Sequence, residues 1–416
     1  MRRQLGLVNI VKSLLIIIVV TIINDGNCFA AIEKVKRVRS GADLSRVLTE
    51  ANTRYIIYSN HTLNNRTVTI GANSILDFQG GVIRKGTLVG DNTIIIAPRV
   101  EILGDDVTVK GSWNVSESYP EWFGAAEGLD CLDAINKAIA ITSSDVVFSL
   151  GEYLVSNTIY TKEKNLNIKR GAVIKALNSM TYMISMRKDR FTLNDGNHTI
   201  SGGGKIDGNA KVKVLITCGN GLRNHIYNLY LCGATEAIFK PLDREKDDNL
   251  NVYFYNCILY NTAQSKDAVA VYNNKADCIY QNLEIIDFRI AIDDYGVGKY
   301  TEVHPWISNK EMYPNSVAFN VNRGRITLVN SEGDSYQYFV KFNVQAIALI
   351  INGSHFINKG LIPDSMTRDY PPLTIFKGKY PSSVVSIYGG RYDRKRFIDA
   401  ISSKDIFSFE KNILSD

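Results

Sequence analysis

Two carboxylates stand side by side, Asp293 and Asp294, in the stretch FRIAIDDYGVGKY at residues 288–300. Carboxylates act as paired acid and base in the hydrolysis of glycosidic bonds, and they also hold Ca²⁺. Hydrolysis requires two carboxyl groups ~5–10 Å apart across the bond that is broken. Because neighbouring strand residues point to opposite faces, Asp293 and Asp294 converge only if the chain turns at Asp294. The Tyr-Gly pair that follows allows such a turn.

Other residues complete this chemistry in different ways. The partner of Asp293 in a hydrolase is either Asp294, Asp267 or an acid of the segment 241–251. In a lyase, which removes a proton from the sugar ring, the base would be Lys299, His304 or an arginine. An exposed Asp-Asp-Tyr-Gly stretch also occurs as a plain solvated turn, so the choice depends on the surrounding elements.

Short alternating apolar runs recur along most of the chain, and each is closed by Gly, Asn or Asp. Alternation with a period of two is typical of strands. The chain has 416 residues, of which 45% are hydrophobic, and this suffices for a large core in one or two domains. With 22 Tyr and only 9 Pro, the composition favours β structure.

The second half of the chain contains a repeat, seen in residues 225–240, 252–273 and 278–294. Each copy has an apolar strand, then an asparagine, then a second apolar strand. Irregular repeats of ~20–30 residues without helices predict a solenoid of parallel strands. The repeated asparagines are Asn228, Asn256 and Asn282, with Asn330 and Asn352 expected in later copies. We expect them to stack at one corner, because Asn tolerates left-handed turns and its amide can bond to the next Asn.

Aligning the three copies on Ala237, Ala270 and Ala291 predicts two stacked columns of side chains near the strand ends. The first column, which should point outward, consists of Phe239, Tyr272 and Asp293. The second, at the strand ends, consists of Lys240, Asn273 and Asp294.

Two segments rich in charge, 241–251 and 295–315, directly follow these columns. Both leave the repeat at the same angular position, so we expect two loops that project from one face and enclose a groove beside Tyr272. The expected substrate-binding residues are Phe239, Tyr272, Asn273, Tyr295, Lys299, His304 and Trp306. The catalytic candidates are Asp293, Asp294 and Asp267.

One segment has helical rather than strand periodicity. In DCLDAINKAIAIT at 130–142 the apolar residues recur at helical spacing, and Asp130 is a candidate N-cap. The helix follows YPEWFGAAEG at 119–128, and ISGGGKIDGNAK lies further on at 200–211. These two motifs resemble those of the pectate lyase and polygalacturonase superfamily. The resemblance implies a parallel β-helix over about residues 115–400, with the helix covering one end.

The expected fold is therefore an all-β, right-handed, single-stranded parallel β-helix of the pectin-lyase type with one short N-terminal capping helix. The catalytic motifs of the polygalacturonase-like hydrolases are mostly missing. Residues 157–159 read NTI where those hydrolases have Asn-Thr-Asp, and residues 354–356 read SHF where they have His-Gly. The Asp293–Asp294 pair matches their Asp-Asp motif in type, but not in order or spacing.

The first thirty residues resemble a secretory signal peptide. Two arginines and Lys12 precede an apolar run from Leu14 to Ile23, and cleavage is expected after Ala30. An uncleaved anchor is the alternative, although the run is short for a membrane span. We expect a signal peptide at 1–30, N-terminal β-strand coils at 31–114 and the β-helix domain at 115–416. The protein should be secreted, periplasmic or on the cell surface, and it should meet the membrane only through the signal segment.

Charge and cysteine usage exclude several classes of site. The net charge is +6, but the basic residues are scattered, so nucleic-acid binding is not expected. Beyond the signal segment five cysteines remain without a Cys-x-x-Cys pair, and we expect them to be buried as small apolar side chains. With only five histidines, no metal site is expected. The one cofactor considered is Ca²⁺, in the case of a lyase.

Together these features predict an exported protein that binds polysaccharide. In its enzymatic form it would be a glycosidase or polysaccharide lyase that acts on an acidic polysaccharide. The alternative is a non-catalytic β-helix that serves as an adhesin, a tail-type protein or a surface scaffold. The resemblance also allows a homo-oligomer, although the sequence contains no coiled-coil heptads to support one.

Overall fold

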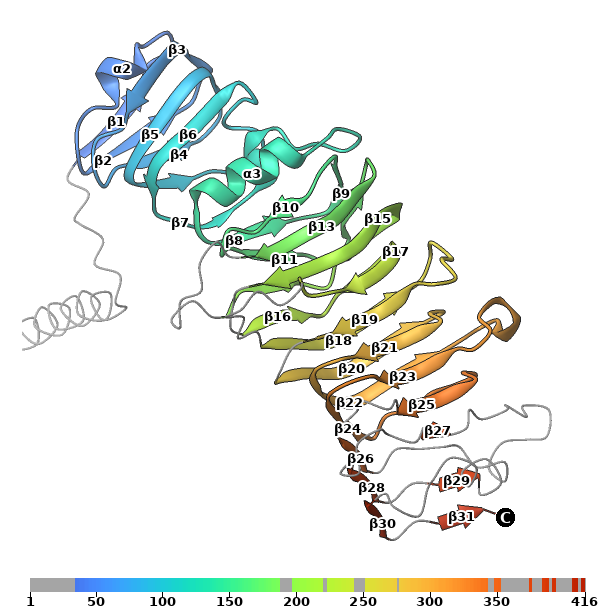
Figure 1. Ribbon diagram of the computed structural model, residues 1–416. Helices are drawn as coiled ribbons and strands as arrows, with labels where there is room; N and C mark the ends of the chain where they lie inside the picture. The colour runs from blue at the N-terminus through green and yellow to red at the C-terminus, as the bar shows by residue number, and fades with distance from the viewer. Residues whose placement is uncertain are drawn as a thin grey trace, which may run out of the picture. The chain divides into compact units, whose positions relative to one another are not determined.

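The structure is all-β, and every hydrogen-bonded pair of its named strands is parallel (Figure 1). It is a computed structural model that describes residues 34–187, 197–219, 223–242, 251–274, 277–342, 348–352, 374–375, 384–388, 391–393, 406–410 and 413–415. The predicted signal peptide at 1–30 lies outside these residues. Among the residues described, no helix is both long and apolar enough to cross a membrane.

The chain divides into two compact units, each with its own contacts. The described part of the first unit comprises residues 34–98 and Val107–Asn114. Its elements are β1 (Lys34–Val38), α2 (Leu44–Val47), β2 (Thr53–Ile57), β3 (His61–Thr69), β4 (Ile75–Phe78), β5 (Ile83–Ile96) and β6 (Val107–Trp113). They form a parallel sheet with the strand order β1-β2-β4-β5-β3, in which β6 also pairs with β5.

The second unit comprises Arg99–Asp106 and the chain from Val115 onward, and it holds the candidate site residues. Its first elements are β7 (Val115–Ser118), η1 (Pro120–Phe123), α3 (Leu132–Ile141), β8 (Thr142–Phe148), β9 (Gly151–Val155), β10 (Ile159–Tyr160), β11 (Asn165–Ile168), β12 (Ala172–Ala176), β13 (Met180–Arg187), β14 (Thr199–Ser201), β15 (Lys205–Gly219) and β16 (Asn224–Tyr227). There follow β17 (Tyr230–Phe239), β18 (Val252–Tyr260), β19 (Val269–Asn273), β20 (Cys278–Ile286), β21 (Ile290–Asp294), β22 (Val297–Trp306), η2 (Lys310–Met312), β23 (Val317–Val321), β24 (Arg325–Val329) and β25 (Tyr338–Phe342). The last described strands are β26 (Ala348–Asn352), β27 (Thr374–Ile375), β28 (Val384–Tyr388), β29 (Arg391–Asp393), β30 (Ile406–Glu410) and β31 (Ile413–Ser415).

Each strand from β16 to β25 pairs with the strand two places further along the chain, so two parallel ladders run through this unit (Figure 1). One ladder is β16-β18-β20-β22-β24-β26-β28-β30, and the other is β17-β19-β21-β23-β25-β27. Parallel pairing places residues of equal register directly beside one another on neighbouring strands. A residue type that recurs with the repeat therefore forms a column across the ladder.

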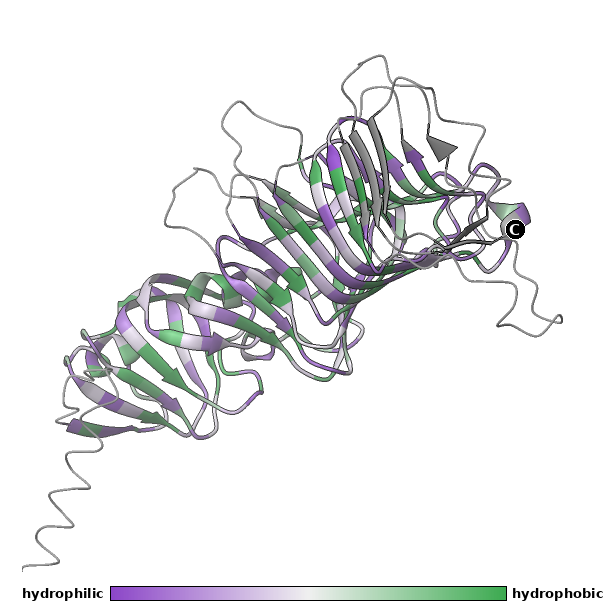
Figure 2. Ribbon diagram, turned by 90° about the horizontal axis from the view of Figure 1, so that it is seen from below, coloured by the Kyte–Doolittle hydropathy of each residue, from purple (hydrophilic) through white to green (hydrophobic). Residues whose placement is uncertain are grey.

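The alternation of side chains separates the core from the surface. Figure 2 shows apolar and polar residues alternating along the strands. Inside the second unit a run of rings is in contact from strand to strand, with neighbouring ring centroids 4.9 to 6.3 Å apart. Its members are Phe239, Phe254, Tyr280, Tyr300, Phe319 and Phe339, all fully buried. Such contacts stabilise the stack beyond the burial of apolar area, by roughly 0.5–1.5 kcal/mol per pair.

The asparagine corner predicted from the repeat is confirmed for its first three members. Asn228, Asn256 and Asn282 all adopt left-handed backbone conformations, with φ between 49° and 54°. The register places them on successive strands, and Nδ2 of Asn282 donates to Oδ1 of Asn256 at 2.9 Å.

Later strands follow this corner with two differences. Glu302 takes the next position, with φ 54°, and Asn330 follows with φ 47°. Asn352 pairs with Val329 instead of Asn330, so it lies one residue before the corner. The expectation for Asn352 is wrong because the register of β26 is offset by one from the asparagine spacing.

The predicted helix is confirmed as α3, although it begins at Leu132 with Cys131 as N-cap. Asp130 lies one residue earlier, and its carboxylate accepts hydrogen bonds from the backbone N–H groups of Leu132 and Ser156. The five described cysteines are buried, as expected, and form no disulfide bonds with one another. Burial raises the pKa of the Cys257 and Cys278 thiols to about 12, so they act as packing groups.

Replacing Asn282 by alanine should destabilise the protein by about 1–2 kcal/mol, because alanine disfavours positive φ and removes the bond to Asn256. Asn282→Gly keeps the backbone conformation and should cost less. Urea unfolding combined with amide exchange in β18 and β20 measures both. Gln281→Ala, an exposed neighbour, is the matched control. Equal stabilities of the alanine and glycine variants would contradict the corner's role.

Candidate functional site

The alignment that placed Phe239 outward is wrong by one residue at its first strand. Ala237 pairs with Val269 and Phe239 with Val271, whereas Val271 pairs with Ile292 as expected. Phe239 therefore lies in the core with no exposed surface. The next residue, Lys240, takes the outward position, and its Nζ lies 5.3 Å from the ring centroid of Tyr272.

Asp293 lies on the outer side of the second ladder, in register with Tyr272 and Asn320. It is only 8% exposed, and its Oδ1 accepts hydrogen bonds from Nδ2 of Asn320 at 2.7 Å and of Asn322 at 2.5 Å. Burial raises the pKa of Asp293, while these amides and Arg289 act in the opposite direction. The partners hold Asp293 in place on a sheet face.

The expectation that Asp294 lies at the floor or wall of a groove is wrong, because strand alternation turns it into the core. Asp294 has no exposed surface. Its carboxylate accepts hydrogen bonds from the Tyr300 hydroxyl at 2.5 Å, the Gly296 N–H at 2.6 Å and Nδ2 of Asn273 at 3.1 Å. Burial raises its pKa to about 6, against the effect of these donors. Asn273, expected to bind substrate, is likewise fully buried as a partner of Asp294.

The other candidates, Asp267, Tyr295 and Lys299, do not line the expected groove together. Asp267 is exposed, with an ion pair of 3.3 Å to Arg289. Tyr295 stacks on Tyr272 at 5.2 Å between ring centroids, and 38% of its surface is exposed. Lys299 is exposed on β22, before the corner at Glu302.

Ten residues of the segment expected as a loop at 295–315 form a strand instead. This strand, β22 (Val297–Trp306), pairs with β20 as far as Trp306 and with β24 over Val297–Thr301. Of the other expected loop, 241–251, residues 243–250 lie outside the described residues. On the β22 side a paired strand therefore takes the place of the expected loop. His304 and Trp306 lie on β22 beside β20, and on their other side the segment after β24 bonds to the backbone of β22.

His304 and Trp306 occupy the two outward positions that follow the asparagine corner. In the register of the first ladder, His304 lies beside Glu284, and Trp306 beside Ile286. On the segment between β24 and β25, the backbone N–H of Glu332 donates to the carbonyl of Val303, and Asp334 pairs with Trp306. The corner thus aligns three side chains in one column, those of Glu284, His304 and Glu332.

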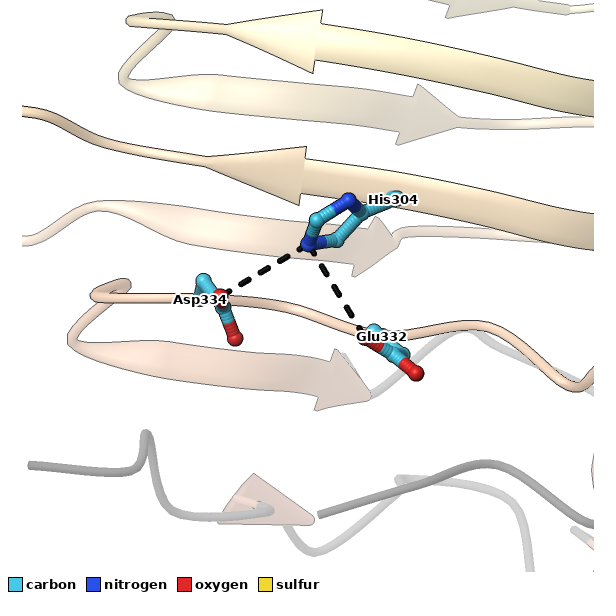
Figure 3. A group of neighbouring side chains, drawn as sticks. All are labelled: His304, Glu332 and Asp334. Carbon is cyan, nitrogen blue, oxygen red and sulfur yellow. Dashed lines mark ion pairs between the residues drawn. The ribbon is translucent and has the colours of Figure 1, made fainter. Parts of the chain in front are cut away.

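Figure 3 shows the side chain of His304, on β22, converging with those of Glu332 and Asp334, on the segment between β24 and β25. Nε2 of His304 lies 3.6 Å from Oδ2 of Asp334 and 3.9 Å from Oε2 of Glu332. On its other side, Nδ1 lies 3.2 Å from Oε2 of Glu284. Asp334 raises the pKa of His304, and Glu284 and Glu332 add to the effect, whereas burial opposes it.

Trp306 completes the arrangement. Its Nε1 donates to Oε1 of Glu284, so one carboxylate holds both the indole and the imidazole. Beside them lies a cavity of about 350 Å³. The cavity is lined by His304, Trp306, Ile307, Ser308, Asp334 and Ser335, and we call it the His304 pocket.

One wall of the His304 pocket is fixed by the chain that follows β22. The backbone N–H and the hydroxyl of Ser308 donate to the buried carboxylate of Asp287 at 2.7 and 2.8 Å. Charge-assisted bonds of this kind are about twice as strong as neutral ones. The pocket is therefore held by ladder strands on one side and by a tethered turn on the other.

Sequence reasoning found His304 and Trp306 but missed Glu284, Glu332 and Asp334. The sequence contains a signal that identifies these residues, because each of the five lies two or four positions after a corner residue. Two places after Asn282, Glu302 and Asn330 stand Glu284, His304 and Glu332, and four places after the last two stand Trp306 and Asp334. Alternation predicts that both positions point outward.

No family model and no curated protein matches this chain. Among solved structures, ORF18 of Geobacillus virus E2 is similar, with a TM-score of 0.43 and 12% sequence identity. The match covers 72% of this chain and 60% of that protein, so the chain spans less than two thirds of its length.

Stability should fall as the pH rises from about 4 to about 7, because Asp294 holds a proton in the folded state up to about pH 6. The unfolded chain releases that proton near pH 4, so the native state binds more protons in this window. The free energy of unfolding therefore falls by up to about 3 kcal/mol across the window. Melting temperatures measured across the window should show a shallower decline for Asp294→Asn.

The matched control for this measurement is Asp267→Asn, which replaces an exposed carboxyl of the same unit. Its decline with pH should parallel that of the wild type. If Asp294→Asn also follows the wild-type curve, Asp294 is ionised throughout the window, and the buried protonated carboxyl is disproved.

Proposed function

We propose that this protein is a right-handed, single-stranded parallel β-helix that binds polysaccharide in the His304 pocket. The two ladders support the β-helix, since pairing with the next-but-one strand is what successive turns of one coil produce. Right-handedness is the usual sense of parallel crossovers. The asparagine corner and the position of α3 agree with the pectate lyase resemblance of the sequence.

One observation carries the proposal of a saccharide ligand: an indole, an imidazole and a carboxylate line one cavity. Trp306 lines the cavity with Asp334, and Glu284 holds the indole from behind. Sugar rings present flat C–H faces that stack on aromatic rings and hydroxyl groups that donate to carboxylates. Ordered groups of both kinds in one concave site are typical of ligand pockets. On the side of β20, which pairs with β22 as far as Trp306, the ladder offers a regular surface for a chain longer than one sugar.

The charge of the pocket restricts the polysaccharide. Glu284, Glu332 and Asp334 surround a single histidine, so a free uronate would be repelled unless a cation intervenes. Neutral sugars would bind directly through their hydroxyl groups. An acidic polysaccharide, suggested by the net charge of +6, would require a bridging ion at this site.

Cleavage of the bound chain is a second candidate function. The observation in its favour is that His304, one of the residues lining the cavity, lies between the carboxylates of Glu284 and Asp334, a combination of groups used in acid–base catalysis. The burial of Asp294 removes the acid pair expected from the sequence. Binding without cleavage would make the protein an adhesin or surface scaffold, and export through the predicted signal peptide suits either role.

Trp306→Ala should weaken binding about tenfold, because the variant removes a stacking face and one partner of Glu284. The measurement is titration of the purified protein with a panel of neutral and uronic-acid polysaccharides, while released reducing ends and unsaturated ends are recorded. Trp306→Phe, which keeps a ring, should retain most of the affinity.

Two controls give the titration its meaning. Trp113→Ala removes a partly buried tryptophan of the first unit and should leave binding unchanged. Tyr272→Ala tests the sheet face of Asp293, which the sequence favoured. A loss of affinity in Tyr272→Ala with none in Trp306→Ala would move the site to that face and disprove the His304 pocket as the binding site.

A further inference from the structure

Three ligand-type side chains meet beside the His304 pocket, one from β22 and two from the segment between β24 and β25. One atom each from His304, Glu332 and Asp334 lies within 4.8 Å of the other two. The nitrogen is Nε2 of His304, at 3.6 Å from the Asp334 carboxylate and 3.9 Å from the Glu332 carboxylate. Ligand atoms bound at ~2.1 Å to one tetrahedral ion lie ~3.4 Å apart. The two distances from Nε2 are within a few tenths of an ångström of this value, and the two carboxylate oxygens, which lie within 4.8 Å of each other, must close to the same separation.

The histidine is oriented for this purpose by groups outside the cluster. The carboxylate of Glu284 accepts a hydrogen bond from Nδ1 of His304 and a second one from Nε1 of Trp306. This chain of bonds places the Nδ1 proton on the Glu284 side and directs the Nε2 lone pair toward Asp334 and Glu332. Metal-binding histidines commonly donate their other ring N–H to a carboxylate in this way.

A hydrogen bond from a protonated Nε2 of His304 fits the observed distances between Nε2 and the two carboxylates less well than a bound metal ion does. Charge-assisted N–H to carboxylate bonds are ~2.7–2.9 Å long, whereas both carboxylates stay beyond 3.5 Å from Nε2. Nε2 is buried, and it makes no hydrogen bond within the described part of the chain. The gap between one nitrogen and two carboxylates has the dimensions that a small divalent cation fills.

We infer that His304, Glu332 and Asp334 bind a divalent ion of the Zn²⁺ class, with its remaining coordination position open to the His304 pocket. Imidazole nitrogen together with carboxylate oxygen suits Zn²⁺ better than Ca²⁺, which prefers oxygen ligands alone. His304 and Asp334 both line the cavity, so an oxygen of a ligand in the cavity can reach the ion. If polysaccharide binding is as proposed above, the ion offsets the local negative charge and accepts a uronate carboxylate.

The test is calorimetric titration of the full mature chain, stripped with EDTA, with ZnCl₂ in the absence of any polysaccharide. One ion should bind per chain. His304→Gln should weaken binding at least ~100-fold, and Glu284→Gln, which loses only the orienting bond, about 10- to 100-fold. Co²⁺ added in place of Zn²⁺ should give visible absorption bands that disappear in His304→Gln.

His225→Gln is the matched control, because His225 stacks on Tyr253 at 4.9 Å in the same unit, away from the three ligands. Its affinity for Zn²⁺ should equal that of the wild type. If His304→Gln fails to fold by circular dichroism, Glu332→Gln carries the test, since the Glu332 side chain is one third exposed.

Absence of Zn²⁺ binding, or binding that survives both His304→Gln and Glu332→Gln, would overturn the inference. So would binding of Ca²⁺ with no competition from Zn²⁺. The outcome is independent of the proposed function, because no sugar is present. A protein that binds Zn²⁺ but none of the polysaccharides keeps the metal site and loses the proposed ligand.

Discussion

Hydrogen bonding between each strand from β16 to β25 and the next-but-one strand determines where the side chains of this part of the second unit lie. The parallel register passes through the corner, where Asn228, Asn256 and Asn282 share one left-handed conformation and the side-chain amide of Asn282 donates a hydrogen bond to that of Asn256. A shift of one residue would reverse every side chain beyond the corner between core and surface. The buried run of rings and the column of Glu284, His304 and Glu332 thus depend on the same constraint.

The adjacent aspartates show how strictly this constraint acts. Asp293 faces outward and is held by two asparagine amides, while Asp294 faces inward and is held by Tyr300 and Asn273. Although the two residues are adjacent in sequence, one side chain lies on the outer face and the other lies in the core. In contrast, residues some twenty to thirty positions apart, His304 with Glu284 and Glu332, become direct neighbours. On such a ladder, side chains that could form a functional site come together from residues of equal register on neighbouring strands, and not from adjacent residues of one strand.

Much of the fold could be predicted from sequence because its signals are local and repeated. The alternation, the first three members of the asparagine corner and helix α3 are predicted correctly, and the five buried cysteines follow from their apolar surroundings. The candidate site is harder to predict, because the sequence does not show the register of the ladder. Phe239 lies one register position from its expected place at the end of β17, and residues 297–306, within the loop expected at 295–315, form β22. Charge at the end of a strand cannot show whether the next segment pairs with the ladder, since pairing depends on long-range contacts.

We propose that the corner-aligned columns at His304 and Trp306 bind polysaccharide. A crystal structure of the protein with an oligosaccharide that binds in solution tests this proposal most directly. We expect electron density for a sugar ring against Trp306, with oxygen atoms directed at the carboxylate of Asp334. Sugar density on the Asp293 face, or on another surface with the His304 pocket empty, would contradict it.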